Sequence, residues 1–247
     1  MAIKRHDGRE PSELREFSFE LGYTEMSLAS CLVTMGSTKV ICAVSLEERV
    51  PPWMRGSGSG WITAEYSMLP SATRERVPRE AVKGKQTGRT VEIQRLVGRA
   101  LRSAFDLKRL GELELIVDCD VIQADGGTRT ASITGASIAL REAVRRLEKD
   151  GRVQPGSMVQ QVAAISMGIV DATPVVDLDY VEDSGAEVDM NLVMNSAGEY
   201  VEIQGTAEGD PFSKGQLVEM LKLGEAGIRR LLKSSDRLFV GAGGGDS

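Results

Sequence analysis

The most informative part of the sequence is Gly126-Gly127-Thr128-Arg129-Thr130-Ala131-Ser132-Ile133-Thr134-Gly135-Ala136. It follows an apolar, strand-like run at 113–121 and opens a segment with apolar residues at helical spacing. The free backbone N–H groups and the dipole of such a helix start favour a bound anion such as phosphate. The guanidinium fork of Arg129 suits phosphate oxygens. The alternative is an ordinary strand-to-helix turn, with Thr128 as its cap and Arg129 in solvent.

Outside this stretch, strand-like and helix-like segments alternate without a regular βαβ order. Helices are expected at 88–106, at 128–147 and after Ser213, where Ser213 and Gln216 have the spacing of a capping box. Strands are expected at 17–21, 27–34, 39–46, 61–68, 112–122, 160–170, 174–178, 188–194 and 200–204. The order favours an α/β fold (α+β layered), with mixed sheets and packed helices, over a Rossmann sheet. No glycine-rich dinucleotide or Walker motif is present.

Length and composition indicate a globular protein. The 247 residues suffice for one large domain or two closely packed halves, followed by a flexible glycine-rich tail at 241–247. The sequence has no apolar run of the roughly 18 residues that a membrane span needs and no apolar signal-peptide core at its start. Three cysteines lie in apolar, strand-like runs, which is typical of buried, reduced thiols. We therefore expect a cytoplasmic protein that does not bind membranes.

Positive charge is concentrated in one segment of an acidic chain. The formal net charge is −6, but between Arg74 and Arg109 eleven basic residues face four acidic ones. A local basic patch matters more to a polyanion than the overall charge does. The segment predicts either a polyanion-binding surface or a solvated helix face with a polar loop.

A second combination of glycine, arginine and threonine, Thr87-Gly88-Arg89-Thr90, opens the predicted helix 88–106. An arginine in a first helical turn is unfavourable to the helix dipole, and a bound anion would offset that cost. Two arginines at two helix starts therefore predict a phosphate pocket more strongly than one. The alternative for Arg89 is a surface residue that tolerates its position.

An acidic run at 177–191 contains a third candidate. Asp189 and Asn191 share one face of the predicted strand because side chains alternate along a strand, and Asp183 lies across a bend from them. Paired carboxylates suit Mg²⁺ held together with substrate phosphate, or one of them acts as a general acid. A solvated acidic turn is the alternative.

Taken together, these motifs resemble ribonuclease PH, a family of phosphorolytic 3′→5′ exoribonucleases related to polynucleotide phosphorylase and the exosome core. The matching pieces follow the family order along nearly the whole chain: Asp7-Gly8-Arg9, Ala64-Glu65-Tyr66-Ser67-Met68-Leu69-Pro70, Gly88 to Arg99, Gly127 to Ala136, Asp177 to Asn191, and Gln204-Gly205-Thr206-Ala207-Glu208.

The resemblance implies a ribonuclease PH-like fold of duplicated βαβα halves, at about 1–110 and 111–240, within a single domain over 1–240. It implies a homohexamer that is a trimer of dimers. The implied activity is that of a tRNA nucleotidyltransferase, which uses phosphate to remove trailing 3′ nucleotides from precursor tRNA and releases nucleoside 5′-diphosphates. The partner is then RNA, in tRNA and rRNA processing, and not DNA.

The resemblance also assigns roles to residues. Inorganic phosphate, the co-substrate, would be bound by Arg89, Gly127, Thr128 and Arg129. Asp183 and Asp189 would be the catalytic carboxylates and would hold Mg²⁺. The residues expected to contact RNA are Arg74, Arg76, Arg79, Arg95 and Arg99.

The sequence departs from the family in one loop. Ser71 stands where the family usually has arginine, and the segment 72–79 differs from the common form. Two other functions remain open: the catalytic subunit of an archaeal-type exosome, which needs a related partner, and a non-catalytic RNA-binding ring subunit. The second would be expected to lack the arginine or carboxylate pair, and this chain has both.

Overall fold

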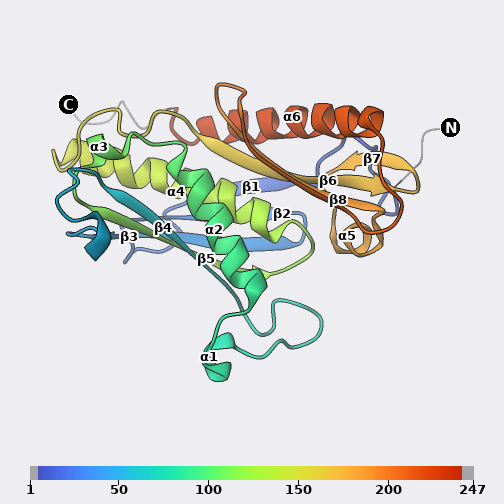
Figure 1. Ribbon diagram of the computed structural model, residues 1–247, viewed down its shortest axis with the longest axis horizontal. Helices are drawn as coiled ribbons and strands as arrows, with labels where there is room; N and C mark the ends of the chain where they lie inside the picture. The colour runs from blue at the N-terminus through green and yellow to red at the C-terminus, as the bar shows by residue number, and fades with distance from the viewer. Residues whose placement is uncertain (1–4, 241–247) are drawn as a thin grey trace.

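Two β-sheets form the framework of the computed structural model, which describes residues 5–240 (Figure 1). The first sheet has the order β1-β2-β3-β5-β4, and only the β4–β5 pair is parallel. The parallel pair requires a crossover, which the chain makes through helices between the two strands. The strands of this sheet are β1 Phe17–Leu21, β2 Ala29–Met35, β3 Thr38–Glu47, β4 Trp61–Met68 and β5 Glu114–Gln123.

The second sheet is antiparallel throughout and has the order β7-β6-β8-β9. Eight of the nine residues of β6 are buried because helices pack on both of its faces. Its strands are β6 Val162–Val170, β7 Thr173–Val176, β8 Val188–Asn195 and β9 Tyr200–Ala207.

Three long helices and several short ones complete the fold. The long helices are α2 Gly88–Arg102, α4 Thr128–Lys149 and α6 Lys214–Asp236. The short ones are α1 Glu80–Lys83, α3 Leu107–Leu110, α5 Tyr180–Gly185 and a 3-10 turn at Pro52–Met54. In Figure 1, α2 and α4 lie beside the first sheet, whereas α6 covers the second.

Helix α4 packs between the two sheets. It contacts β2 and β3 on one side and β6 on the other, so sixteen of its residues are buried. A side chain at Gly135 would place its Cβ 2.3 Å from Val33 Cγ2, which explains the glycine at this contact. Buried hydroxyls on the opposite side bond to β6, since Ala164 N donates to Thr134 Oγ1 at 3.0 Å. The helix that begins at the Gly126-Gly127 turn is thus the central element of the fold.

The predicted layered α/β class with packed helices is confirmed, although only the first of the two sheets is mixed. Each predicted strand and long helix is present, with ends that differ by a few residues. The helix expected over 88–106 is an exception, because it ends at Arg102 and the chain then turns into α3. The short helices α1 and α5 were not predicted. The tail expected to be flexible at 241–247 lies outside the described residues.

The three cysteines are buried and unpaired, as the sequence predicts. They lie on adjacent strands, with Cys42 opposite Cys31 on one side and Cys119 on the other. Burial raises the pKa of Cys31 to about 12. The pKa of Cys42 is also raised, by its contact with Cys119 and by burial, so this thiol stays protonated and unreactive at neutral pH. Among residues 5–240, no helix is both long and apolar enough to span a membrane.

Candidate active site

A cleft of about 320 Å³ lies where the starts of α2 and α4 meet α5 and β8. Its lining includes the six residues to which the sequence assigned phosphate or catalysis: Arg89, Gly127, Thr128, Arg129, Asp183 and Asp189. Asn191, expected on the same strand face as Asp189, also lines it, as do Ser166 and Tyr180, which were not singled out. Residues of α2, α4, α5 and β8, which are far apart in the sequence, therefore meet in one cleft.

The Gly126-Gly127 turn shapes the start of α4. Both residues have positive φ, +76° and +67°, and a Cβ on Gly126 would lie within 3 Å of the backbone at Leu178 and Asp179. Only glycine fits this approach. Gly127 occupies the cap position and no side chain caps the helix, so the N–H groups of the first turn remain available to an anion.

Thr128 is not the helix cap that the alternative interpretation supposed. It is the first residue of α4, and its Oγ1 lies 2.9 Å from the hydroxyl of Tyr66 on β4. Burial raises the pKa of Tyr66, partly offset by its bond to Thr128 and by the charges of Arg89 and Arg129. The phenol therefore remains a neutral hydrogen-bonding partner of the helix start.

The start of α2 resembles that of α4. Thr87 is its cap and accepts a hydrogen bond from Thr90 N at 3.3 Å. Arg89 is exposed and is the second residue of α2, the position that Arg129 has in α4. Two cations thus occupy helix ends where a negative charge is favoured. An anion in the cleft between them would be stabilised by both arginines and by the α4 dipole.

Arg129 is not free in solvent. Its Nη1 donates to Oε1 of Gln204 on β9 at 2.9 Å and lies 3.4 Å from Oε2 of Glu92 on α2. Sequence reasoning did not identify these two partners, although both belong to the motifs that resemble ribonuclease PH.

The two carboxylates approach the cleft from α5 and β8. Asp183 is exposed and Asp189 is half-buried, and Asp189 shares the cleft side of β8 with Asn191. Partial burial raises the pKa of Asp183, while the charges of Arg89 and Arg129 oppose that shift. Burial and the neighbouring Asp183 raise the pKa of Asp189, again against the two arginines. The negative charge of Asp183 therefore acts on Asp189, and the positive charges of Arg89 and Arg129 act on both carboxylates.

Asp183 and Asp189 suit a metal ion only of the kind that takes few ligands from the protein. Within residues 5–240, no group of three or more His, Cys, Asp or Glu side chains is placed to hold a metal. Mg²⁺ is commonly bound by one or two carboxylates, with water and substrate phosphate completing its octahedron. Asp183 and Asp189 fit that donor set, whereas a site built wholly from protein ligands does not.

A buried ionic network, which sequence reasoning missed, supports α5. Arg15 donates from Nη2 to Asp177 Oδ1 at 2.7 Å and from Nη1 to the carbonyl oxygen of Asp125 at 2.6 Å. Arg5 and Arg9 both pair with Glu182, the residue before Asp183. The Asp7-Gly8-Arg9 motif and the acidic run at 177–191 were the sequence signals of this network, which attaches the N-terminal segment to the element that bears Asp183.

The arginines expected to contact RNA are spread over two regions. Arg74, Arg76 and Arg79 are exposed in the segment between β4 and α1. Arg95 is exposed on α2, whereas Arg99 forms an ion pair with Glu202 at 2.7 Å. Of these five, only Arg79 lines a described cleft, and none lines the cleft that holds the two carboxylates.

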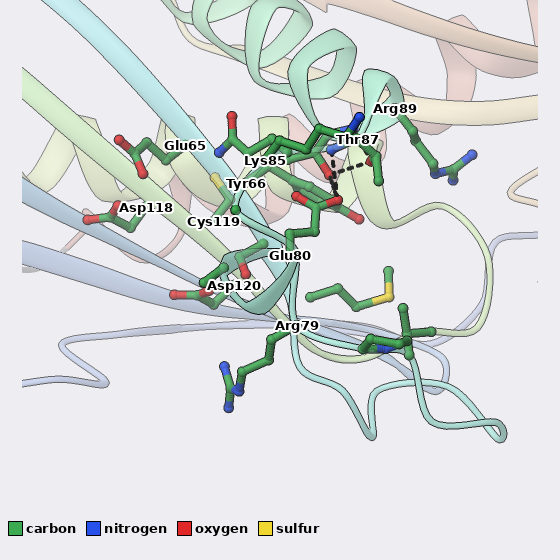
Figure 2. Close-up of a pocket in the computed structure, with 18 residues that line it drawn as sticks. Glu65, Tyr66, Arg79, Glu80, Lys85, Thr87, Arg89, Asp118, Cys119 and Asp120 are labelled. Atoms are coloured by element: carbon green, nitrogen blue, oxygen red, sulfur yellow. Dashed lines mark hydrogen bonds between the residues drawn. The ribbon is translucent and has the colours of Figure 1, made fainter.

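A second cleft, the one that Arg79 lines, is larger, about 780 Å³. It shares Arg89 and Met68 with the cleft that holds the two carboxylates. Figure 2 shows Glu65, Asp118 and Asp120 on one side, and Arg89 extending away from them. Burial and the two neighbouring carboxylates raise the pKa of Asp118. This acidic wall repels a polyanion, whereas the arginine side attracts one.

Comparison with known proteins agrees with these observations. The model of "3′ exoribonuclease family, domain 1" matches residues 13–145, and that of "3′ exoribonuclease family, domain 2" matches residues 160–227. The first match alone covers more than half of the chain and includes both helix starts. The second includes Asp183, Asp189 and Gln204.

Solved structures with a similar fold include two exosome chains. A chain of the Archaeoglobus fulgidus exosome with RNA bound to the active site has a TM-score of 0.79 at 22% identity, over 93% of this chain and 92% of that one. Rice (Oryza sativa) Rrp46 has a TM-score of 0.76 at 18% identity, over 94% and 98% of the two chains. A chain of an archaeal exosome core has a TM-score of 0.74 at 20% identity, over 94% and 91%. At these identities the likeness establishes the fold.

Proposed function

This chain belongs to the 3′ exoribonuclease family, the family of ribonuclease PH, and from that premise we propose that it is a phosphate-dependent 3′→5′ exoribonuclease. The observation that supports the proposal is the meeting of Arg89, Arg129, Asp183 and Asp189 in one cleft. A non-catalytic ring subunit has no need of this combination. Members of the family use inorganic phosphate as a substrate.

In the proposed reaction, Arg89, Arg129 and the N–H groups at Gly127 and Thr128 bind inorganic phosphate. A phosphate oxygen attacks the phosphorus of the last phosphodiester bond, and the bond from that phosphorus to the 3′ oxygen breaks. The terminal residue leaves as a nucleoside 5′-diphosphate, and the 3′ oxygen of the shortened RNA takes up a proton. Because nucleophile and target are both anionic, charge neutralisation by the arginines is the main requirement.

The carboxylates have two possible tasks in this scheme. Asp189, with its raised pKa, is suited to hold the proton that the leaving 3′ oxygen needs. Alternatively, Asp183 and Asp189 hold Mg²⁺, which when bound supplies positive charge beside that oxygen. The two tasks differ in whether activity depends on a divalent cation, which chelation tests directly.

We propose precursor tRNA with a 3′ extension as the substrate and a homohexamer, a trimer of dimers, as the active form. The exposed Arg74, Arg76 and Arg79 offer phosphate contacts to a single strand near the cleft. The exosome chains of similar fold come from multi-subunit assemblies, which supports a ring. A catalytic subunit of an exosome-type ring is the second candidate, supported by the same fold likeness. It predicts no activity without a partner.

One experiment tests activity and assembly together. The purified chain is incubated with 3′-extended tRNA with and without inorganic phosphate, and products are separated by chromatography. We expect nucleoside diphosphates only with phosphate, and a loss of at least about a hundredfold in Arg129→Ala and Asp189→Asn. Wild-type rates in both variants, or monophosphates at full rate without phosphate, would rule the proposal out.

The mass in solution separates the two assemblies. An active species with six times the chain mass supports the homohexamer. An inactive monomer or dimer that gains activity only with a second protein supports the exosome-type subunit. Addition of EDTA to the active species then decides between the metal-dependent and the metal-free task of the carboxylates.

A further inference from the structure

The guanidinium of Arg129 is held on one side by two residues from other parts of the fold. Its Nη1 donates to Gln204 Oε1 at 2.9 Å and lies 3.4 Å and 3.5 Å from the two carboxylate oxygens of Glu92. Gln204 Nε2 in turn donates to Glu92 Oε1 at 3.1 Å. The three side chains close a triangle that joins α4, β9 and α2.

This triangle uses only part of the donor capacity of Arg129. Within residues 5–240, the hydrogen bonds and ion pair of Arg129 all involve Nη1. Arg15 differs, because its Nε, Nη1 and Nη2 all donate to protein oxygens. Arg129 therefore keeps Nε and Nη2 for an anion in the cleft that it lines.

We propose that Glu92 and Gln204 are positioning residues, which fix Arg129 by one nitrogen so that the remaining fork binds the attacking phosphate. The inference rests on the proposed phosphorolytic function and adds two residues that touch no substrate themselves. A long arginine side chain loses rotamer freedom when it binds an anion, and fixing it beforehand removes part of that cost.

The triangle is not needed to attach α2 to β9. Arg99, seven residues after Glu92 on the same side of α2, pairs with Glu202 at 2.7 Å and 3.0 Å. Glu202 lies two residues before Gln204 on β9, so both point to the same side of the strand. A variant of Glu202 therefore breaks an equivalent bridge between the same elements without touching Arg129.

Charge and geometry predict opposite results at Glu92. A purely electrostatic view says that removing the Glu92 carboxylate strengthens phosphate binding, because one negative charge leaves the neighbourhood of the anion. If Glu92 positions Arg129, its loss weakens phosphate binding instead. Glu92→Gln removes the charge but keeps an oxygen that accepts from Arg129, so it retains the positioning.

The test measures KM for phosphate, KM for RNA and kcat in the wild-type protein and four variants. We expect Gln204→Ala and Glu92→Ala to raise the phosphate KM by about three- to tenfold, with the RNA KM unchanged. Glu92→Gln is expected to stay within about twofold of the wild type. The matched control Glu202→Ala, which removes both oxygens that accept from Arg99, is expected to leave the phosphate KM unchanged.

Each outcome has one reading. A wild-type phosphate KM in Gln204→Ala, or a lower one in Glu92→Ala, overturns the positioning role while phosphorolysis itself stands. An equal rise in Glu202→Ala also overturns it, because attachment of α2 to β9 would then explain the effect. Absence of phosphate-dependent cleavage in the wild type would instead defeat the proposed function. Gln204→Leu, of similar size, replaces Gln204→Ala if that variant does not fold.

Discussion

Ionisation of Asp189 costs more free energy than ionisation of an ordinary surface carboxylate. The side chain is half-buried on β8, and the neighbouring Asp183 adds a second negative charge. Both effects raise its pKa, and the two arginines oppose them only in part. A site suited to charged ligands keeps its own charges partly unsatisfied before those ligands bind, at some cost in stability.

This cost predicts that Asp189→Asn is more stable than the wild type where Asp189 is ionised. Because the pKa of Asp189 is raised in the folded protein, ionised Asp189 destabilises the fold at every pH above that raised pKa. This destabilisation disappears below the pKa that Asp189 has in the unfolded chain. We expect a gain of about 1 kcal/mol, or ~2–4 °C in Tm, at about pH 8. The gain should shrink towards about pH 3, below the unfolded pKa of an aspartate, where protonated Asp189 is as neutral as the asparagine that replaces it. Melting curves at both pH values measure it, and a less stable variant at the higher pH would contradict it.

Local chemistry explains which site residues could be predicted. Arg89 and Arg129 were identifiable because glycine, hydroxyl and arginine at a helix start point to an anion without knowledge of tertiary structure. Arg15 and Asp177 form a buried pair across 162 residues of sequence. No local pattern shows which arginine a distant aspartate meets, so this pair, like Gln204 beside Arg129, needed the structure.

At the scale of elements, the turn before α4 fixes the position of the phosphate residues. Gly126 has φ +76° and lies against the backbone at 178–179, which leads directly into α5. This close approach links the helix start that bears Arg129 to the short helix that bears Asp183. The turn therefore sets the distance between the two halves of the candidate site.

Gly126→Ala is expected to destabilise the protein much more than Gly151→Ala, at the other end of α4. Both glycines have positive φ, but a Cβ on Gly151 meets nothing within 4 Å. The control should cost about 1–2 kcal/mol from backbone strain alone. Gly126→Ala should cost about 2–3 kcal/mol more, because carbonyl and Cα atoms cannot yield as side chains do. Urea unfolding of both variants measures the difference, and equal costs would show that the approach is not tight.

The elements themselves were predictable where periodicity was strong. Strands β3, β4 and β5 alternate buried with less buried residues, so their patterns mark them as strands. Helix α5 has six residues and no apolar stripe, and it was missed. Its one sequence signal is a capping box, in which Asp179 accepts a hydrogen bond from Glu182 N. Asp179 lies four residues before Asp183.

At the scale of the whole molecule, the buried ion pair between Arg15 and Asp177 joins the N-terminal segment to the second sheet region. Asp177 is fully buried with φ +57°, a conformation that Asn and Asp tolerate better than other side chains. The charge of Asp177 is the main cause that raises the pKa of Arg15, against the effect of burial. Each charge of this buried pair is therefore stabilised by the other.

Arg15→Met is expected to cost about 3–5 kcal/mol because it leaves the buried Asp177 with Arg9, 3.7 Å away, as its remaining cation. The double variant Arg15→Met/Asp177→Asn removes both charges and keeps the backbone conformation, so it should recover part of that loss. Urea unfolding of the two single variants and the double variant gives the coupling energy. Additive losses would mean that the two side chains do not depend on each other.

The basic segment between β4 and α1 leads to the last prediction, on RNA rather than on stability. Arg74, Arg76 and Arg79 are exposed, and no buried group depends on them. If they contact the RNA backbone, their replacement by alanine should raise the RNA KM and leave the phosphate KM unchanged. Each lost contact with single-stranded RNA should also reduce the slope of log affinity against log salt by about 0.7.

A matched control separates this local effect from net charge. Lys222, Arg230 and Lys233 are equally exposed but lie on α6, which covers the second sheet. Their replacement by alanine removes the same charge, so a general loss of electrostatic attraction would weaken RNA binding equally in both triple variants. We expect the salt slope to change only in the variant of the basic segment. Equal changes would mean that RNA senses the overall charge of the protein, and that the strand reaches the cleft by another route.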